Sequence, residues 1–299
     1  MYANGLLHEW IQQNHDGLPQ KAGMPQAGLN EIHGSWFDPC NPVVPMSGRL
    51  RGDLVRRLRE TTKNSDLVIA LGTSLSGVMA DQIVSSVGRR AAEAREGQGK
   101  APAAGASRPS SGASCSSHEP LVEAAESAVA ARPSVVIINA QQTRLDGVAS
   151  LRIFAKLDDV LKQLCKELGL AATGIAATHE AAPRRAPKED VWEALPYGED
   201  GLPCSDGTLT LDLTRGKKVV LTDGNPPLVK PGTAGVVGPK TKQGHYTVVL
   251  EGGKSCTLGV WHLHEAKAGT LPRLPLINAQ RASSDTHVHR YIPSSQRQR

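Results

Sequence analysis

The alternation of apolar and polar positions divides the chain into two regions with different periods. From residue 1 to about residue 92, short apolar runs alternate with helical patterns, which is typical of a parallel α/β sheet. Between residues 192 and 279 the apolar runs are short and are separated by Gly, Pro and Asp turns, as in a small antiparallel barrel. A chain of 299 residues is long enough for two such domains.

Individual strands and helices can be placed in the first region from these periods. The runs Asp66–Leu71, Ser134–Asn139 and Leu151–Ala155 predict buried strands. Leucines recur every four positions in 49–63, which predicts a crossover helix, and apolar residues at i, i+3, i+4 and i+7 predict a second helix over 157–168. Asp158 and Asp159 suit the positive N-terminal end of that second helix.

The strands of the second region are expected in four runs. These are Lys217–Leu221, Gly235–Val237, His245–Leu250 and Thr257–Leu263.

Composition sets the expected domain boundaries. Residues 93–120 are dominated by Ala, Gly, Ser and Pro and lack the apolar periodicity that would offset the entropy of ordering them, so we expect a disordered insertion there. A short helix is expected near 121–131. The remaining boundaries are a first domain over 1–170, a linker over 171–191, a small β domain over 192–279 and a disordered tail over 280–299.

Charge and cysteine usage narrow the class of protein. The net charge is +5, but much of it lies in 183–188 and 281–299, which argues for basic linkers rather than a nucleic-acid groove. The cysteines lie far apart and the N-terminus lacks the pattern of a signal peptide, so we expect reduced thiols in an intracellular protein. The longest apolar run, Leu67–Leu71, is too short to cross a bilayer, which excludes a membrane span.

Polar side chains follow an apolar run near the N-terminus. Gln13, Asn14 and Asp16 come directly after it, so they are expected at the end of a strand. In open α/β sheets that end is where ligands bind. Buried amide and carboxylate side chains can hold a planar carboxamide in one orientation through paired hydrogen bonds.

The order of these motifs resembles the signature of the sirtuin family. The matching residues are Gln13, Asn14, Asp16, Ala22, Gly23, His33 and Gly34, followed by Leu71–Leu75 and by Ile138 with Asn139. The resemblance covers about residues 1–170. It implies a Rossmann-like parallel sheet, NAD as the cofactor, and an acyl-lysine protein as the substrate, so the expected fold class is α/β with a second, small all-β barrel.

The resemblance also assigns roles to single residues. It implies that Gln13, Asn14 and Asp16 line the nicotinamide pocket. His33, whose side-chain type titrates near neutrality, is expected to act as the general base. The implied reaction releases nicotinamide and transfers the acyl group from lysine to ADP-ribose.

The nucleotide end of the cofactor is expected at the ends of two later strands. Gly72, Thr73 and Ser74 at a strand-to-helix turn let the backbone approach a nucleotide and donate to ribose or phosphate. Asn139 is expected to serve the adenosine ribose. Gly-Thr-Ser alone is also common as a helix N-terminus, and Asn139 alone as the cap of a strand end.

The chain departs from the family pattern in three places. His15 stands at the apolar position of the tetrad. Cys40 has no cysteine partner nearby, so we expect no zinc and a shortened loop, with Val43 and Val44 as the edge that accepts the acyl-lysine peptide. The Gly-Ala-Gly-Ile-Ser loop is not found before residue 12, so we expect an incomplete sheet that binds NAD weakly.

Other interpretations of the sequence stay open. A different class of function is a catalytically inactive module that holds ADP-ribose while the β domain recruits protein or nucleic acid. The segment Gly232–Gly238 is similar to the turn of small SH3-like domains of the KOW type, although a plain barrel explains it as well. Cys256, His262 and His264 could be drawn as a metal cluster on one strand face, but paired surface histidines are commoner and no metal is expected.

Overall fold

A computed structural model describes residues 1–99, 132–170 and 189–279. It divides into two compact units: unit 1 comprises Met1–Ser35 and Val43–Ala182, and unit 2 comprises Trp36–Pro42 and Pro183–Arg299. The predicted helix near 121–131, residues 100–120 of the predicted insertion, the linker over 171–188 and the tail over 280–299 lie outside the described residues.

Unit 1 is built on parallel strands, which confirms the predicted α/β class. Strand β1 (Trp10–Gln12) pairs with β2 (Leu29–Glu31), and β3 (Leu67–Leu71), β4 (Ser134–Ile138) and β5 (Leu151–Ile153) form a second sheet in the order β3-β4-β5. Within the described parts of the chain, no ladder joins the two sheets. Because β3 and β4 are parallel neighbours, their carboxyl ends meet at one edge of their sheet.

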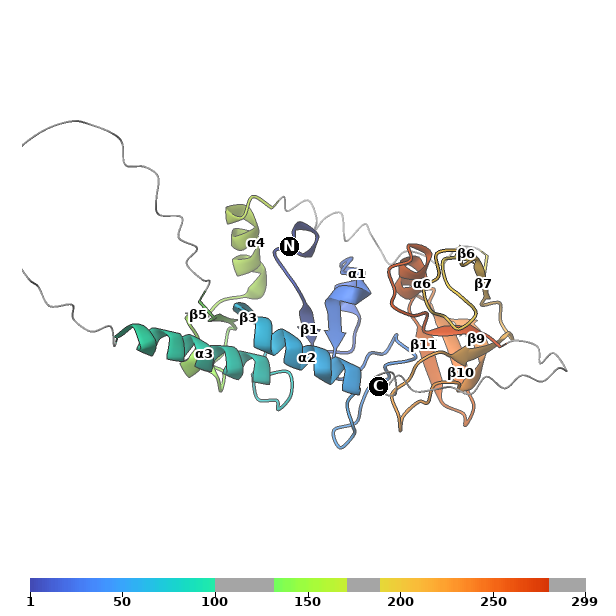
Figure 1. Cartoon of the computed structure of the whole chain (residues 1–299), viewed down its shortest axis with the longest axis horizontal. Helices are drawn as coiled ribbons and strands as arrows, with labels where there is room; N and C mark the ends of the chain where they lie inside the picture. The colour runs from blue at the N-terminus through green and yellow to red at the C-terminus, as the bar shows by residue number, and fades with distance from the viewer. Residues whose placement is uncertain (100–131, 171–188, 280–299) are drawn as a thin grey trace, which may run out of the picture. The chain divides into compact units, whose positions relative to one another are not determined.

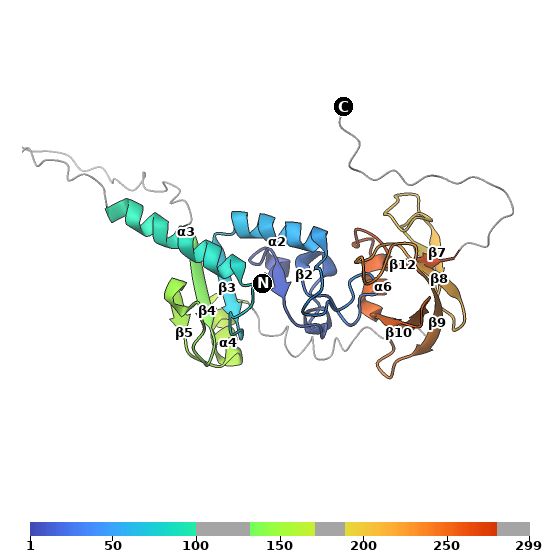
Figure 2. The ribbon, with the colours of Figure 1, turned by 90° about the horizontal axis from the view of Figure 1, so that it is seen from below.

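Two helices lie along one side of these strands, as Figures 1 and 2 show. Helix α2 (Gly52–Asn64) contacts β2, and α3 (Gln82–Gly99) contacts β3 and β4. Leu58 of α2 is 2% exposed, because the four-residue leucine spacing turns one stripe of the helix toward the core. The helix predicted over 49–63 is confirmed.

Helix α3 corrects the predicted start of the insertion. Residues 93–99 continue this helix rather than opening a disordered segment. The buried Val87 and Ala91 fix the preceding turns, and a helix that has already formed extends readily through Ala, Glu and Arg.

No helix among the described residues combines the length and apolarity needed to cross a bilayer.

The remaining helical elements of unit 1 are short or solvent-facing. They are η1 (Tyr2–Asn4), α1 (Leu18–Lys21), η2 (Gln26–Gly28), η3 (Asp146–Val148) and α4 (Leu157–Glu167). Helix α4 confirms the helix predicted over 157–168, but none of its residues is fully buried.

Unit 2 is a small antiparallel β structure, as predicted. Strands β8 (Lys218–Leu221), β9 (Ala234–Lys240), β10 (Tyr246–Leu250), β11 (Ser255–Leu258) and β12 (Leu276–Asn278) form one sheet in the order β11-β10-β9-β8-β12. The hairpin of β6 (Val191–Leu195) and β7 (Leu209–Asp212) adjoins β12, because the Asn278 amide exchanges two hydrogen bonds of 2.7 Å with the backbone of Asp212. The resemblance of this unit to KOW domains stays a prediction.

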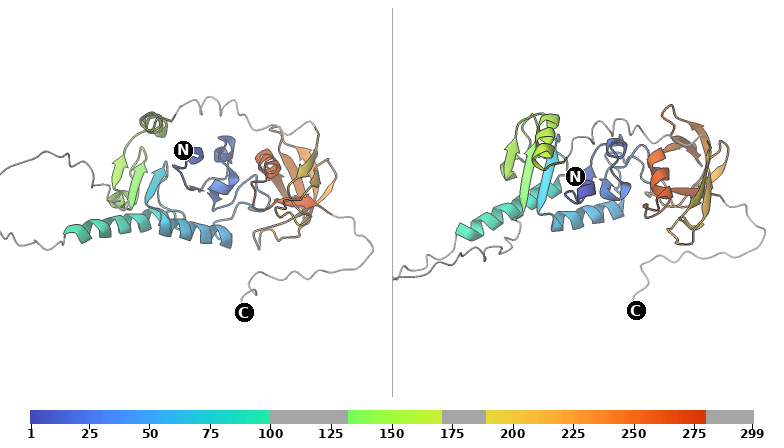
Figure 3. Two further views of the ribbon diagram at one scale, coloured as in Figure 1. Left: turned by 45° about the horizontal axis from the view of Figure 1, so that its top comes forward. Right: turned by 90° about the horizontal axis from the view of Figure 1, so that it is seen from above.

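Helix α6 (Val260–Lys267) replaces the second half of the strand predicted over 257–263. In Figure 3 this orange-red helix lies against the strands of its unit. The buried residues Val260, Leu263 and Ala266 are three apart, which is a helical spacing. His262 and His264 are therefore on a helix and not on one face of a strand, and no group of three or more potential metal ligands occurs among the described residues.

The short segment Trp36–Pro42 belongs to unit 2, although the sequence suggested a loop of the first domain. The Phe37 ring lies 4.9 Å from the His245 ring and 5.1 Å from the Trp261 ring, measured between centroids. The Phe37 carbonyl accepts a hydrogen bond from Gly259, and the Cys40 thiol donates to the Pro275 carbonyl at 2.8 Å. Through Phe37 and the buried Cys40, this segment packs against the β unit.

Candidate functional site

His33 lies just beyond β2 and its ring reaches the loop that follows β1. The ring hydrogen-bonds the backbone of Gln13, and His15 and Asp81 are close enough to act on its charge. Burial lowers the pKa of His33 below its ordinary value of 6.5, and His15 lowers it further, while the Gln13 backbone and the Asp81 carboxylate oppose the shift. His33 is therefore neutral at pH 7.

This hydrogen bond also decides which ring nitrogen can accept a proton. A neutral imidazole has one donor and one acceptor nitrogen. The backbone of Gln13 raises the pKa of His33, as a carbonyl acceptor does, so one ring nitrogen carries the donated hydrogen. The other nitrogen then has the lone pair that a general base needs.

Asp81 is a site residue that the sequence did not predict. It is only 6% exposed, and it accepts hydrogen bonds from Gln13 Nε2 at 2.8 Å and from the Gly77 backbone at 2.5 Å. These bonds tie the loop after β1 to the loop after β3. The available signal was an Asp directly before an apolar helical pattern, which is typical of a helix start and gives no hint of a distant partner.

Asn14 and Asp16 lie on the same loop but differ in their hydrogen bonding. Asn14 is exposed, and no hydrogen bond of its side chain to the described residues is found. Asp16 Oδ1 accepts from the Leu18 backbone at 3.1 Å and from Gln12 Nε2 at 3.4 Å, so its carboxylate is bonded to the first residue of α1. His15, which replaces the apolar residue of the tetrad, bonds through Nδ1 to the Gly34 carbonyl at 2.7 Å.

The Gly72–Ser74 segment is followed by an irregular loop and not by a helix. Helix α3 begins only at Gln82, so the expected strand-to-helix turn is wrong, and so is the alternative of a helix N-terminus. Gly72 has a φ of +59°, and Leu75 at the buried base of the loop also has a positive φ, 51°. The Thr73 hydroxyl accepts from the Leu75 backbone at 3.2 Å, and Ser74 is exposed.

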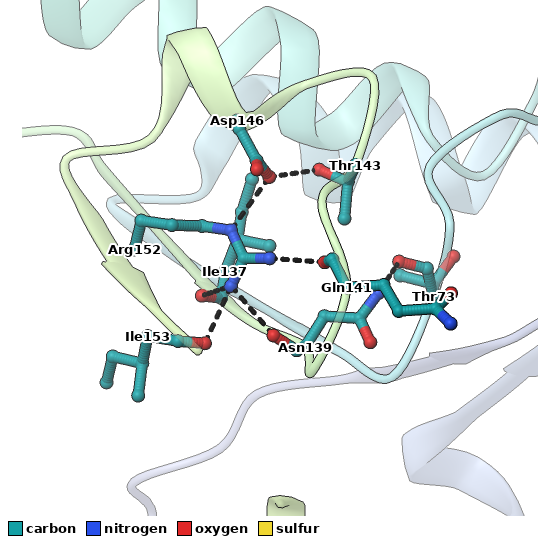
Figure 4. A network of polar contacts seen from close by, with 8 residues as sticks. All are labelled: Thr73, Ile137, Asn139, Gln141, Thr143, Asp146, Arg152 and Ile153. Carbon is teal, nitrogen blue, oxygen red and sulfur yellow. Dashed lines mark hydrogen bonds and ion pairs between the residues drawn. The ribbon is translucent and has the colours of Figure 1, made fainter. Parts of the chain in front are cut away.

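Asn139 joins this loop to the end of β4. Its side-chain amide donates to the Thr73 carbonyl at 2.9 Å, and its backbone N–H donates to the Ile153 carbonyl at 3.1 Å. Figure 4 shows the Asn139 side chain directed toward Thr73. The structure therefore brings together the residues predicted for the nucleotide end.

Val43 and Val44 return the chain to unit 1 beside the candidate base. The Val44 N–H donates to the His33 carbonyl at 3.0 Å. Neither valine belongs to a strand, and both are partly exposed. Their role as an edge for an acyl-lysine peptide stays a prediction.

The predicted residues thus form two groups within unit 1. The first, the β1–β2 group, contains Gln13, Asn14, Asp16 and His33, and the second, the β3–β4 group, contains Gly72, Thr73, Ser74 and Asn139. Asp81 links the two groups through its bond to Gln13. The arrangement offers a neutral imidazole, an exposed amide and a backbone turn with a positive φ.

Comparisons with known proteins agree with the motifs. No family model matches the chain. It is 25% identical to the NAD-dependent protein deacetylase sirtuin-7 of Homo sapiens over 230 residues, which is 70% of this chain and 57% of that protein. The Rattus norvegicus sirtuin-7 is 25% identical over 177 residues, or 57% of this chain and 43% of that protein. The chain spans about half the length of these curated relatives.

Solved structures of Sir2 proteins are also similar, at a lower level. Sir2 in complex with the inhibitor EX-527, 2'-O-acetyl-ADP-ribose and deacetylated p53 peptide has a TM-score of 0.39 and 18% identity over 57% of this chain and 68% of that chain. Sir2 with a p53 peptide and NAD+ has a TM-score of 0.38 and 19% identity over 57% of this chain and 67% of that chain. TM-scores this low add nothing to the similarity that the sequence relatives show.

The site belongs to a parallel α/β unit with polar groups at the ends of its strands. The sequence relatives that the chain matches are sirtuins, the family that the motifs resemble.

Proposed function

We propose that unit 1 carries the NAD site of a protein-lysine deacylase, with His33 as its general base. The observation that carries this proposal is the state of His33: it is neutral, oriented by the backbone of Gln13, and placed beside the loop that holds Asn14 and Asp16. A pKa below the ordinary value keeps the imidazole ready to take a proton at pH 7. The names of the sequence relatives, which are NAD-dependent protein deacetylases, support the same activity.

The residues of both groups fit the chemistry of NAD. The exposed amide of Asn14, which makes no hydrogen bond to the described residues, can pair with the donor and acceptor of a nicotinamide carboxamide. Asn139 uses its amide hydrogen on Thr73 and keeps Oδ1 as an acceptor for a ribose hydroxyl. When bound, NAD supplies an electrophilic ribose carbon and a nicotinamide leaving group. The role of His33 is to accept a proton from a ribose hydroxyl at its free ring nitrogen.

Release of nicotinamide tests this proposal directly. The full chain is incubated with NAD and an acetylated lysine peptide, alongside His33→Ala and, as a matched control, His8→Ala, which removes an exposed histidine. We expect release that depends on the peptide, a loss of about 100-fold or more in His33→Ala, and no change in His8→Ala. Activity that survives His33→Ala would remove the proposed mechanism. Acetyl, succinyl and fatty-acyl peptides in the same assay define the acyl group.

One observation favours a second candidate, an ADP-ribose-binding module without turnover. The β3–β4 group is held together by hydrogen bonds, whereas Asn14 in the β1–β2 group is exposed and Asp16 is engaged with α1. A chain that binds ADP-ribose by calorimetry and releases no nicotinamide with any acyl peptide would establish this second function.

A further inference from the structure

The segment after β4 is gathered around a single guanidinium, which Figure 4 shows. Arg152 Nη1 donates to the carbonyls of Ile137 at 3.3 Å, Asn139 at 3.1 Å and Ile153 at 2.6 Å, and Nη2 donates to the Gln141 carbonyl at 2.5 Å. The side chain is only 12% exposed. A cation this well buried requires such compensation, because burial of a charge without partners is costly.

Asp146 holds the same guanidinium from the other side. Arg152 Nε donates to Asp146 Oδ1 at 2.8 Å, and the Thr143 hydroxyl donates to the same oxygen at 2.5 Å. The Thr143 hydroxyl above all, and Arg152 in addition, lower the pKa of Asp146, so its carboxylate is ionised at neutral pH. Residues 139–146 are therefore fixed at both ends by one side chain.

Only arginine can make this set of contacts. Its planar guanidinium carries five N–H donors in a fixed fork, whereas a lysine ammonium is a point charge with three donors. The carbonyls of Ile137 and Ile153, at the carboxyl ends of β4 and β5, both accept hydrogen bonds from this guanidinium. The guanidinium thus supplies donors that a further strand would otherwise supply. A lysine at position 152 keeps the charge and loses most of the contacts.

The network fixes the backbone of Asn139 and so aims its side chain. The Asn139 carbonyl is bonded to Arg152, its N–H to the Ile153 carbonyl, and its Nδ2 to the Thr73 carbonyl. Its Oδ1 accepts no hydrogen bond from the described residues. Asparagine in a loose loop readily bonds to its own backbone, which would remove this acceptor.

We infer that Arg152, held by Asp146, is a positioning residue that presents the Asn139 side chain to the nucleotide. This inference rests on the proposed NAD site and adds a residue to it, since Arg152 acts through Asn139 and does not touch the ligand. It predicts a selective effect, in which the affinity for the nucleotide depends on Arg152 and the use of the acyl peptide does not.

The test compares Arg152→Lys with Arg144→Lys, which alters an exposed arginine of the same loop, in the full-length chain. Hydrogen exchange of residues 139–146 is measured without ligand, and the affinity for ADP-ribose by calorimetry. In Arg152→Lys we expect faster exchange and an affinity about tenfold lower, with Asp146→Asn intermediate and Arg144→Lys unchanged. In the nicotinamide assay, the KM for NAD rises while the KM for the peptide stays constant.

The outcomes separate this inference from the function on which it rests. If the wild type binds ADP-ribose and Arg152→Lys matches Arg144→Lys in exchange and affinity, the positioning role is refuted while the NAD site stands. If Arg152→Lys raises both KM values equally, the residue is merely structural and the inference fails. A wild type that binds no ADP-ribose removes the NAD site and the inference together.

Discussion

The two ends of the candidate site differ in how far they are built before any ligand arrives. In the β3–β4 group, Thr73 and Asn139 are bonded to each other, and the loop behind them is fixed by Arg152. In the β1–β2 group, His33 is oriented, but Asn14 is exposed and Asp16 is engaged with α1. An end that is already ordered loses less entropy on binding. The nucleotide end is therefore expected to supply most of the affinity, and the other end the chemistry.

Asp81 links the two ends of the site, so we expect its substitution to reduce activity more than the other substitutions below. Asp81→Asn places an amide where both neighbours, Gln13 Nε2 and the Gly77 N–H, are donors, and one of them loses its acceptor. We expect nicotinamide release to fall about tenfold or more, from a loss of about 1–3 kcal/mol. Asp66→Asn, which changes an exposed carboxylate of unit 1, is the control.

Asp81→Asn is also expected to change how the activity depends on pH, in a direction that follows from the charges around His33. The Asp81 carboxylate raises the pKa of His33 against the larger effect of burial, so its removal lowers that pKa further. A base is active in its unprotonated form, so wild-type activity is lost as the pH falls through a value below 6.5. In Asp81→Asn this acid limb moves to lower pH. A limb that moves upward would contradict the arrangement around His33.

Asn14→Ala is expected to have a smaller effect, limited to the binding of nicotinamide in the β1–β2 group. The Asn14 amide is exposed and makes no hydrogen bond to the described residues, so stability should not change. We expect inhibition by free nicotinamide to weaken about five- to tenfold, which is the cost of about one hydrogen bond, while the affinity for ADP-ribose stays constant. Asn64→Ala, at an exposed asparagine, serves as the control. Equal losses for both ligands would show that the two ends are not separate.

Gly72→Ala tests the nucleotide end with the smallest expected effect. Its φ of +59° disfavours an L residue, and a Cβ would lie 3.0 Å from Leu157 Cδ1. We expect a destabilisation of about 1–2 kcal/mol in thermal unfolding. Gly147→Ala meets nothing within 4 Å and should be nearly neutral. A fully stable Gly72→Ala would indicate that this turn is not held as described.

Local patterns in the sequence predicted the elements of unit 1 well. The leucine spacing predicted α2 and the apolar periodicity predicted α4, because both depend on neighbours within a few residues. Burial does not follow from that spacing: the stripe of α4 is only partly covered. The assignment of His33 and Asn139 as site residues, taken from the motif order, stays a prediction.

Long-range contacts were beyond the reach of the sequence. The bond between Asp81 and Gln13 joins residues 68 positions apart, and no local rule relates them. The assignment of Trp36–Pro42 to unit 2 depends in the same way on ring contacts of Phe37 with His245 and Trp261. Helix α6 was missed because its apolar residues also fit a short strand, which periodicity alone cannot distinguish over a few residues.

The central claim is that the ring of His33 faces the nicotinamide half of a bound dinucleotide. Imidazole resonances of the intact chain, assigned with His33→Ala and followed by NMR during addition of NAD, report on this most directly. We predict a pKa below 6.5 for His33 in the free chain and a shift of its ring signals with NAD that His8 does not share. Ring signals of residue 33 that remain unchanged at saturating NAD would contradict it.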